Sequence, residues 1–233
     1  LTRLSTVPLQ TKLGCHFKCV YCTYRKIEGH DYRFCDPAMV VDTIKHLADL
    51  GFRDIEFVDN VFNSPRDHAL AICDGVARAR PDVRLQSLEL NPLFIDDELL
   101  TVMETAGFVG MGITAESASG VVLDGLQKGF TREHVQNAAR VVQRHKIPCL
   151  WIFMLGGPCE TKDTVQETLH FAEQFIRPKD VVFFNIGIRI YPGTALEQRA
   201  RKEGVLALPP GEMLEPVFYL SPGIDLDWII STI

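Results

Sequence analysis

"KLGCHFKCVYCTY", residues 12–24, places three cysteines within eight positions, at Cys15, Cys19 and Cys22, in the pattern C-x3-C-x2-C. A structural zinc site commonly takes four ligands from two separated C-x2-C pairs, and the sequence has no second pair. A disulfide with one spare thiol has no evident purpose inside such a loop. Iron–sulfur clusters take thiolates, so three thiolates would bind three irons of a cubane. The pattern therefore indicates an iron–sulfur site whose fourth iron is open to another ligand.

The remaining cysteines do not form a second group. They are scattered along the chain at Cys35, Cys73, Cys149 and Cys159, which makes seven in all. A disulfide scaffold is normally shorter and denser in cysteine than a chain of 233 residues with seven thiols. The cysteine usage therefore predicts a reducing, cytoplasmic compartment.

The composition is that of an ordinary globular chain. Of the 233 residues, 46% are hydrophobic and 23% are charged, which is ample for a core and argues against disorder. The net charge of −6 gives no basic footprint for nucleic acid. The apolar run "LWIFMLGG" (150–157) is far too short to cross a bilayer. Composition thus indicates one large α/β domain or two small ones, with no membrane segment.

Strand-like apolar runs alternate with helical periodicity through most of the chain. The predicted strands are 8–13, 54–60, 83–91, 109–117, 149–157 and 181–190, and the predicted helices are 36–51, 64–81, 96–107, 131–146, 161–176 and 194–204. The strands are mostly continuous apolar runs, which is typical of a parallel sheet buried on both faces. Strand–helix units repeated in this way imply right-handed crossovers. An open three-quarter barrel and a doubly wound sheet both remain compatible with this pattern.

In either architecture the functional face lies beyond the carboxyl ends of the strands. The loops that follow the six predicted strands share a polar and glycine-rich character. In chain order they supply Cys15 to Cys22, Asp59 with Asn60, Asn91, Glu116 with Ser117, residues 156–161, and residues 189–194. A purely structural scaffold has no reason to concentrate cysteines, carboxylates and amides there, so these loops predict a site.

The cysteine motif, with the aromatic Tyr21 just before its third cysteine, resembles the radical S-adenosylmethionine (radical SAM) superfamily. The resemblance implies a partial (β/α)6, TIM-like barrel with a parallel sheet, which favours the open barrel over the doubly wound sheet. It also implies that Cys15, Cys19 and Cys22 bind a [4Fe–4S] cluster. S-adenosylmethionine (SAM) would chelate the open iron through its amino and carboxylate groups. An electron passed to its sulfonium would yield methionine and a 5′-deoxyadenosyl radical.

The segment "FVDNVFN" (57–63) stands where many members of the superfamily carry a Gly-Gly-Glu motif. The resemblance implies that Asp59 and Asn60 supply acceptors for the methionine amino group of SAM, although the glycines are absent here. A plainer interpretation is that Asp59 caps a turn, which is a common role of Asp after a strand.

The segment "GITAESAS" (112–119) resembles the fourth-strand "G-x-E-S" segment of the superfamily. The resemblance makes Glu116 and Ser117 candidate contacts to the ribose or to the methionine of SAM. The plainer interpretation is that both residues cap a short helical stretch that follows them.

The segment "FMLGGPCET" (153–161) resembles the fifth-strand "G-x-P-G-E-T" segment that lies along the adenine, with Cys159 in place of a glycine. Gly156 and Gly157 are therefore candidate SAM contacts, although glycines also simply allow tight turns. Arg189, at the end of the sixth predicted strand, is a further candidate because a charge at that place needs a partner.

The segment "IRIYPGTALEQRARKEG" (188–204), with "IEG" (27–29) and "FVDNVFNSPRDHA" (57–69), resembles the cobalamin-binding branch of the superfamily. Members of that branch usually carry a cobalamin domain upstream of the cysteine motif. The chain begins at Leu1 rather than at Met. We therefore expect residues 1–233 to be the radical SAM catalytic domain of a longer protein, with cobalamin bound mainly by a domain outside this chain.

The leading hypothesis is a cobalamin-dependent radical SAM methyltransferase that acts at carbon. The alternatives are a cobalamin-independent radical SAM enzyme, which performs hydrogen abstraction, methylthiolation or ring formation, and a non-catalytic iron–sulfur or zinc binding module. The resemblance implies a small-molecule or peptide-like substrate and a reductant such as flavodoxin or ferredoxin. The sequence does not identify the substrate.

Overall fold

The computed structural model describes residues 6–209, 212–213 and 215–233. The predicted domain of 1–233 therefore includes a few positions, residues 1–5, 210–211 and 214, that lie outside the described residues. No helix within the described ranges combines the length and the apolar character needed to cross a membrane.

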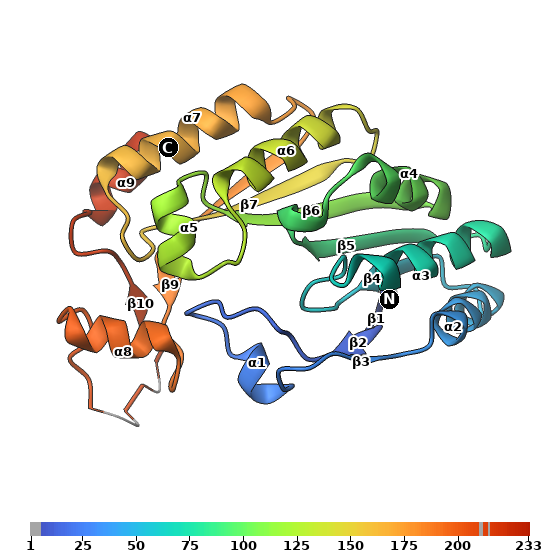
Figure 1. Cartoon of the computed structure of the whole chain (residues 1–233), viewed down its shortest axis with the longest axis horizontal. Helices are drawn as coiled ribbons and strands as arrows, with labels where there is room; N and C mark the ends of the chain where they lie inside the picture. The colour runs from blue at the N-terminus through green and yellow to red at the C-terminus, as the bar shows by residue number, and fades with distance from the viewer. Residues whose placement is uncertain (1–5, 210–211, 214) are drawn as a thin grey trace, which may run out of the picture.

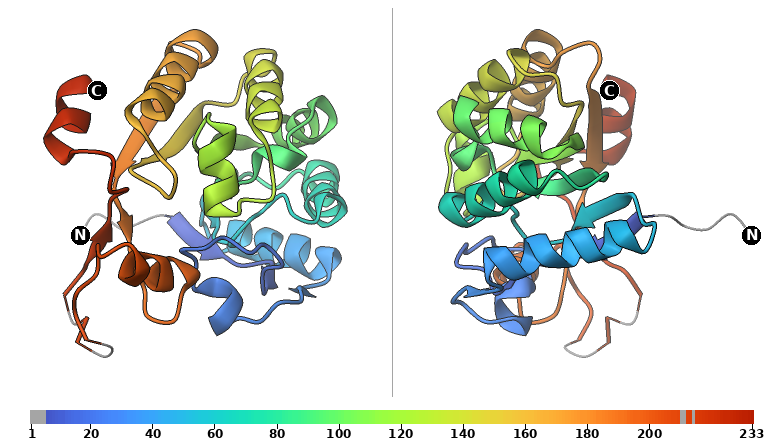
Figure 2. Two further views of the ribbon diagram at one scale, coloured as in Figure 1. Left: turned by 60° about the vertical axis from the view of Figure 1, so that its left-hand side comes forward. Right: turned by 90° about the vertical axis from the view of Figure 1, so that its right-hand side faces the viewer.

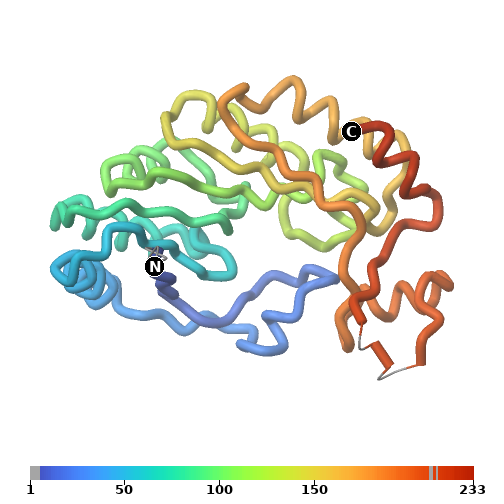
Figure 3. The backbone as a smooth tube through the Cα atoms, turned by 180° about the vertical axis from the view of Figure 1, so that it is seen from behind, coloured from blue at the N-terminus to red at the C-terminus, as the bar shows by residue number. Residues whose placement is uncertain are grey.

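The centre of the structure is a six-stranded sheet in which every pair of neighbouring strands is parallel. In spatial order it comprises β1 (Thr6–Leu9), β4 (Asp54–Phe57), β5 (Arg84–Leu90), β6 (Phe108–Glu116), β7 (Cys149–Leu155) and β8 (Val181–Ile186). This order is also the chain order, as the progression of colours across the sheet in Figure 3 shows. A doubly wound sheet requires a point where the strand order reverses. The sheet has none, so the prediction of a partial (β/α)6 barrel is confirmed.

Five long helices cover one face of the sheet in an arc (Figures 1 and 2). They are α2 (Pro37–Asp49), α3 (Arg66–Ala79), α4 (Asp97–Ala106), α6 (Arg132–Gln143) and α7 (Lys162–Phe175). Their starts follow local chemistry, because the Asp36 and Asp96 side chains accept from backbone N–H groups of the first turn. Gly107 ends α4 in the left-handed conformation that glycine adopts at little cost.

The main hydrophobic core lies between these helices and the outer face of the sheet. Its largest fully buried side chains include Phe57, Phe62, Trp151 and Phe153. Strand residues alternate in burial, so that Ile55 and Phe57 of β4 are buried while the residues between them are only half-buried. The outer face is thus packed, and the inner face is left for the site.

The first predicted strand, 8–13, was wrong in its extent. The parallel strand β1 ends at Leu9, and β2 (Lys12–Leu13) instead pairs antiparallel with β3 (Arg33–Phe34). Asp59, which follows β4, accepts from the backbone N–H groups of Thr11 and Lys12 and so draws the chain away from the sheet. The cysteine loop therefore leaves and returns through a small two-stranded ribbon.

The sixth predicted strand, 181–190, is divided at Gly187. Gly187 has a φ of +75°, and a Cβ atom there would lie 3.3 Å from the carbonyl oxygen of Tyr219. Beyond it, β9 (Ile188–Arg189) pairs antiparallel with β10 (Phe218–Tyr219). The chain after β8 thus leaves the sheet and includes α8 (Ala195–Lys202) and α9 (Leu226–Thr232), and α9 returns to pack against α7 through Ile229 and Val165.

Three short helical segments lie in the loops at the carboxyl ends of the strands. They are α1 (Tyr24–Ile27), the 3-10 turn η1 (Pro92–Phe94) and α5 (Gly120–Leu126). The last of these is the short helical stretch expected after Ser117. All three close the loops that surround the site.

Candidate active site

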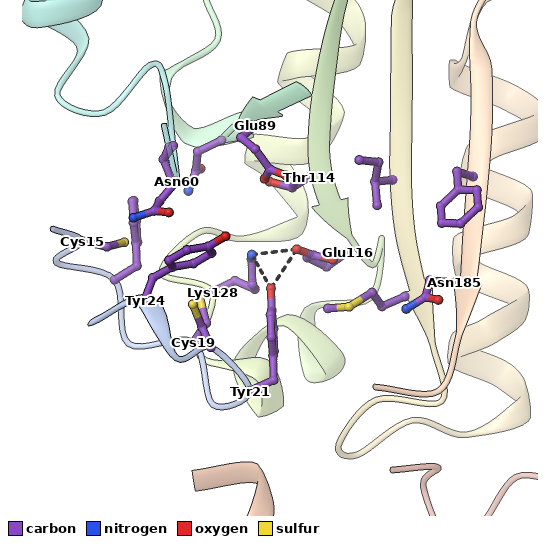
Figure 4. Close-up of a pocket in the computed structure, with 17 residues that line it drawn as sticks. Cys15, Cys19, Tyr21, Tyr24, Asn60, Glu89, Thr114, Glu116, Lys128 and Asn185 are labelled. Atoms are coloured by element: carbon purple, nitrogen blue, oxygen red, sulfur yellow. Dashed lines mark hydrogen bonds and ion pairs between the residues drawn. The ribbon is translucent and has the colours of Figure 1, made fainter. Parts of the chain in front are cut away.

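A cavity of about 320 Å³ lies where the cysteine loop meets the sheet (Figure 4). All three motif cysteines, Cys15, Cys19 and Cys22, line it, together with side chains from five strands or their following loops. The opposite wall includes Met154 of β7 and Asn185 of β8. The structure therefore brings the predicted thiols to the predicted carboxyl-end face.

The cysteine loop is held in place by its backbone. The N–H of Cys15 donates to the Gly29 carbonyl at 3.2 Å, and the N–H of Cys22 donates to the Cys19 carbonyl at 3.2 Å. Gly14 has a φ of +90°, and a Cβ atom there would lie only 2.2 Å from the Asp31 carbonyl oxygen. Only glycine fits directly before the first thiol, because both the conformation and the space exclude a side chain.

The electrostatic setting of the thiols is mixed. Burial raises the pKa of Cys19, and the nearby Lys128 ammonium lowers it. Burial also raises the pKa of Cys15, with Lys128 again opposing the rise. Metal ligands must be thiolates. Lys128 is therefore the positive charge that favours the ligating form of both thiols.

Three side chains form a closed hydrogen-bonded triangle beside the cysteines (Figure 4). The Tyr21 hydroxyl donates to Glu116 Oε1 at 2.9 Å, and Lys128 Nζ donates to the same oxygen at 2.9 Å and to the Tyr21 oxygen at 2.9 Å. Both bonds to Glu116 end on Oε1, and Oε2 accepts from no side chain or backbone group in the described ranges. Glu116 therefore keeps one carboxylate oxygen available to a ligand in the cavity.

The charges of the triangle are set by its burial. Burial lowers the pKa of Lys128, but the adjoining Glu116 carboxylate, with Tyr21 and Cys19, outweighs it and holds that pKa well above its usual value. Burial and Glu116 raise the pKa of Tyr21 well above its usual value. Near neutral pH the lysine is therefore charged and the tyrosine is neutral. Glu116 also has a φ of +63°, a left-handed backbone conformation that costs a non-glycine residue energy and recurs at functional sites.

Ser117 lies next to Glu116 in sequence but faces the other way. Its hydroxyl is buried, is 3.1 Å from the hydroxyl of Thr168 in α7, and accepts from the Ser119 N–H. The side chain is not part of the cavity wall. The structure thus gives Ser117 a part in fixing the turn after β6.

The predicted pair after β4 is divided in the same way. Asp59 is fully buried, and its carboxylate accepts from Thr11 N–H at 2.8 Å, Thr11 Oγ1 at 2.7 Å and Lys12 N–H at 3.0 Å, with Lys12 Nζ at 3.5 Å. Asn60, by contrast, lines the cavity and donates to Glu28 of the cysteine loop at 2.6 Å. Asp59 therefore holds the start of the loop, and Asn60 reaches the site.

The glycines after β7 form a tight turn around a buried acid. The N–H groups of Gly156 and Gly157 donate to Glu160 Oε2 at 2.5 and 2.9 Å. Burial raises the pKa of Glu160 to about 7, against these two hydrogen bonds. A Cβ atom on Gly156 would lie 2.3 Å from Leu220. Gly156 also has a φ of +91°, so the turn depends on this glycine, and neither Gly156 nor Gly157 lines the cavity.

Arg189 lies on β9, outside the parallel sheet. Its side chain is exposed and stacks on Tyr191, with the guanidinium carbon 4.9 Å from the ring centroid. It is not among the residues that line the cavity. The charge that seemed to need a buried partner is accommodated because β8 ends before it and the following strand is turned to solvent.

Two charged residues of the cavity wall, Lys128 and Glu89, were not predicted as site residues. Lys128 lies just after α5, and Glu89 lies in β5, within the predicted strand 83–91. Burial, followed by the charge of Glu116, raises the pKa of Glu89 to about 7. The signal in the sequence that could have pointed to Glu89 is its place near the carboxyl end of a predicted parallel strand.

The family model described as the radical SAM superfamily matches residues 10–172. That range includes the cysteine motif, the triangle around Glu116 and most of the barrel. The chain belongs to the radical SAM superfamily. Membership implies a [4Fe–4S] cluster and SAM as cofactors.

The donor set of this radical SAM chain fits such a cluster. No three His, Cys, Asp or Glu side chains of the described part of the chain gather closely enough to hold one metal ion. Each thiolate of a cubane binds a different iron. Thiols that share one cavity, beside a positive charge, are therefore the arrangement that the cluster requires.

Two curated relatives illustrate the similarity of this radical SAM chain. One, 26% identical, is an uncharacterized methyltransferase of Pyrococcus horikoshii, with 85% of this chain and 42% of that protein covered. The other, 29% identical, is a tRNA-2-methylthio-N6-dimethylallyladenosine synthase of Desulforamulus reducens, with 79% and 42% covered. The chain thus spans under half the length of these relatives.

Among solved structures, the chain is similar in fold to the radical SAM methyltransferase TsrM of Kitasatospora setae. With tryptophan and a SAM analogue bound, that protein superposes with a TM-score of 0.81 at 22% identity, over 94% of this chain and 49% of that one. With cobalamin and a [4Fe–4S] cluster bound, the TM-score is 0.76 at 24% identity, over 94% and 44%. At these identities the likeness establishes the barrel fold alone.

Proposed function

We propose that Cys15, Cys19 and Cys22 ligate one [4Fe–4S] cluster and that SAM binds beside it in the cavity. We further propose that the parent protein is a cobalamin-dependent methyltransferase acting at carbon. The observation that carries the first part is the shared cavity, which is lined by the three thiols and by Glu116. When bound, the cluster supplies the electron that cleaves the sulfonium of SAM.

The residues of the chain have separable parts in holding SAM. Glu116 Oε2 accepts from the ribose diol, because a carboxylate oxygen that faces a cavity favours a hydroxyl donor. Tyr21 and Lys128 hold Glu116 through its other oxygen, which orients the carboxylate. Asn60 offers its amide oxygen to the methionine ammonium, since its amide nitrogen is already bound to Glu28.

The other predicted residues act through the backbone. Asp59 positions the start of the cysteine loop through Thr11 and Lys12. Gly156 and Gly157 hold the turn after β7 around Glu160, beneath the place where the adenine would lie. Arg189 faces solvent beside Tyr191, so we assign it to a surface that another part of the parent protein covers.

Cobalamin is supported by similarity of fold and by the length of the relatives. The TsrM structure contains cobalamin and shares the barrel, and the chain covers less than half of that protein. A corrinoid needs a broad face on each side, and the mouth of an open barrel supplies one. In this proposal residues 1–233 form the catalytic domain, and a further domain of a longer cytoplasmic protein holds the other face.

A second candidate function is methylthiolation without cobalamin. It is favoured by the similarity to the tRNA-2-methylthio-N6-dimethylallyladenosine synthase, which is slightly higher in identity than that to the uncharacterized methyltransferase. The two candidates share the cluster and SAM, and both need a reductant such as flavodoxin or ferredoxin. They differ in that only the methyltransferase requires a bound corrinoid.

The cluster assignment is tested by replacing each motif cysteine with Ala and reconstituting the protein without oxygen. We expect Cys15→Ala, Cys19→Ala and Cys22→Ala to lose bound iron and sulfide, since each thiolate holds a separate iron. Cys35→Ala is the matched control, because Cys35 is exposed and lies outside the cavity. A Cys35→Ala variant that loses the cluster as completely as Cys22→Ala would contradict the assignment.

The reaction is tested on the full-length protein, purified without oxygen, supplied with cobalamin and given SAM with a deuterated methyl group. Label that enters a product only when cobalamin is present supports the methyltransferase. Formation of 5′-deoxyadenosine by a full-length protein that binds no corrinoid would favour the second candidate instead.

A further inference from the structure

The inner face of the barrel has two chemically different sides. On β4 and β5, the half-buried or exposed positions include the polar residues Glu56, Gln86 and Glu89. On β7 and β8, the corresponding wall of the cavity is mainly apolar and includes Ile152 and Phe183. Figure 4 shows Glu89 and Thr114 on one side of the cavity, with Asn185 of β8 on the other. The cavity is therefore bordered by an acid on one side and, apart from the amide of Asn185, by apolar side chains on the other.

Glu89 is the acid of the cavity wall whose side chain makes no ion pair or hydrogen bond within the described residues. The neighbouring Glu116 is paired with Lys128 at 2.9 Å, and Glu56 accepts from Gln86 at 3.2 Å. The Glu89 side chain has no hydrogen bond or ion pair with any residue that the structure describes, although its backbone carbonyl accepts from Phe62. A carboxylate that faces a cavity favours a cationic partner. Glu89 is thus an acid whose ionised form a cationic ligand would stabilise.

The apolar side of the cavity also leaves hydrophobic side chains exposed. Phe183 is 53% exposed, and Val181, two residues earlier on the same face of β8, is 61% exposed. Ile152 of the adjoining strand β7 is half-buried. Burial of such surface against an apolar or aromatic group is favourable. The wall therefore fits the body of a ligand whose charged end lies toward Glu89.

We propose that the cavity binds a substrate that carries a cationic nitrogen next to an apolar or aromatic body. The nitrogen donates to Glu89, and the body packs on Ile152 and Phe183. This inference rests on the proposed function in one respect, which is that the cavity of the cysteines is the active site. It adds the chemical class of the substrate, and it makes Glu89 the residue that selects that class.

The test uses the full-length protein with its cluster reconstituted and SAM bound. The probes share one aromatic body and differ in the charge of their tails: phenethylamine is cationic, 2-phenylethanol is neutral and 3-phenylpropionate is anionic. Binding is measured by titration calorimetry without oxygen. We expect phenethylamine to bind about ten- to a hundredfold more tightly than 2-phenylethanol, as for one hydrogen bond to a charged group, and 3-phenylpropionate to bind most weakly.

The variants assign the preference to a residue. Glu89→Gln should abolish the preference for the cation while binding of 2-phenylethanol is retained, because the amide keeps the shape and loses the charge. Glu56→Gln is the matched control on the next strand, and the preference should persist there because Glu56 already has a partner. Phe183→Ala should weaken the cationic and the neutral probe by the same factor.

Three outcomes overturn the proposal: equal affinity for the three probes, binding of none of them, or a preference for the cation that survives Glu89→Gln. Iron content and SAM affinity are measured on every variant. A Glu89→Gln protein that loses SAM affinity tenfold would assign Glu89 to the methionine of SAM and also overturn it. Wild-type protein that holds neither cluster nor SAM would instead refute the proposed function, and this is seen before any probe is added.

Discussion

The carboxyl ends of β4 and β6 are each marked by an acid, Asp59 just after β4 and Glu116 as the last residue of β6, yet the two acids have different roles. Asp59 is surrounded by the N–H groups of Thr11 and Lys12 and by the Lys12 ammonium, and it faces the protein. Glu116 is held by Tyr21 and Lys128 through one oxygen, and it faces the cavity with the other. An acid after a parallel strand is thus a site residue only where its neighbours leave an oxygen free.

The largest effect expected from this comparison is on stability, in Asp59→Asn. Burial lowers the pKa of Lys12 and Asp59 opposes this, so removal of the negative charge leaves a buried ammonium without its counter-ion. We expect a loss of about 3–5 kcal/mol in the free energy of unfolding, measured by urea denaturation, with unchanged SAM affinity where the protein is folded.

Two further variants sharpen that experiment. Adding Lys12→Met to Asp59→Asn should recover most of the loss, because both members of the buried pair are then neutral. Asp42→Asn, at an exposed ion pair with Lys45, should change stability by less than about 0.5 kcal/mol. A strong fall in SAM affinity in folded Asp59→Asn, with no loss of stability, would show that Asp59 contributes to SAM binding as Glu116 does.

A third acid, Glu160 after β7, extends the comparison with Asp59 and Glu116 because it should make the stability of the protein depend on pH. Its pKa is raised to about 7 from 4.5 by burial, so the folded state binds a proton more tightly than the unfolded state. The contribution of Glu160 to the free energy of unfolding is therefore fully present below about pH 4.5. It falls as the pH rises and is lost above about pH 7.

We therefore expect Glu160→Gln to remove a pH-dependent loss of up to about 3 kcal/mol in the free energy of unfolding between pH 4.5 and 8. The amide oxygen can still accept from Gly156 and Gly157. Urea denaturation at several pH values checks this against Glu173→Gln, whose carboxylate is exposed on α7. Parallel pH profiles for wild type and Glu160→Gln would show that burial does not raise the pKa of Glu160.

Glu116→Gln should reduce SAM affinity about ten- to a hundredfold, or about 1.5–3 kcal/mol, because one charge-assisted hydrogen bond to the ligand is lost. Its matched control is Ser117→Ala, whose hydroxyl lies against Thr168 and away from the cavity. Equilibrium dialysis with labelled SAM on the reconstituted protein measures both. Equal losses in the two variants would place SAM along the whole turn rather than against Glu116.

The smallest effect is expected at Arg189. Its stacking on Tyr191 is exposed, so Arg189→Ala should lower the free energy of unfolding by less than about 1 kcal/mol. SAM affinity should be unchanged, since the residue does not line the cavity. A tenfold loss of SAM affinity in Arg189→Ala would return this residue to the site.

The sequence by itself determined the class of fold and the position of the thiols. Strand and helix periods are local properties, so the order of the strand–helix units and the helix caps at Asp36 and Gly107 could be predicted. The three cysteines lie within one short loop, and a loop after a first parallel strand must open at the carboxyl-end face. These features need only neighbouring residues and the handedness of the crossovers.

Only the tertiary structure decided which polar residues face the cavity. Glu116 meets Tyr21 from 95 positions away, and Asp59 meets Thr11 from 48 positions away. Each buried polar group takes whatever partner the packing brings to it, because an unsatisfied group in the interior costs free energy. That partner is chosen by contacts between distant segments, so Ser117 turned to α7, Glu89 turned to the cavity, and the chain after Gly187 left the sheet.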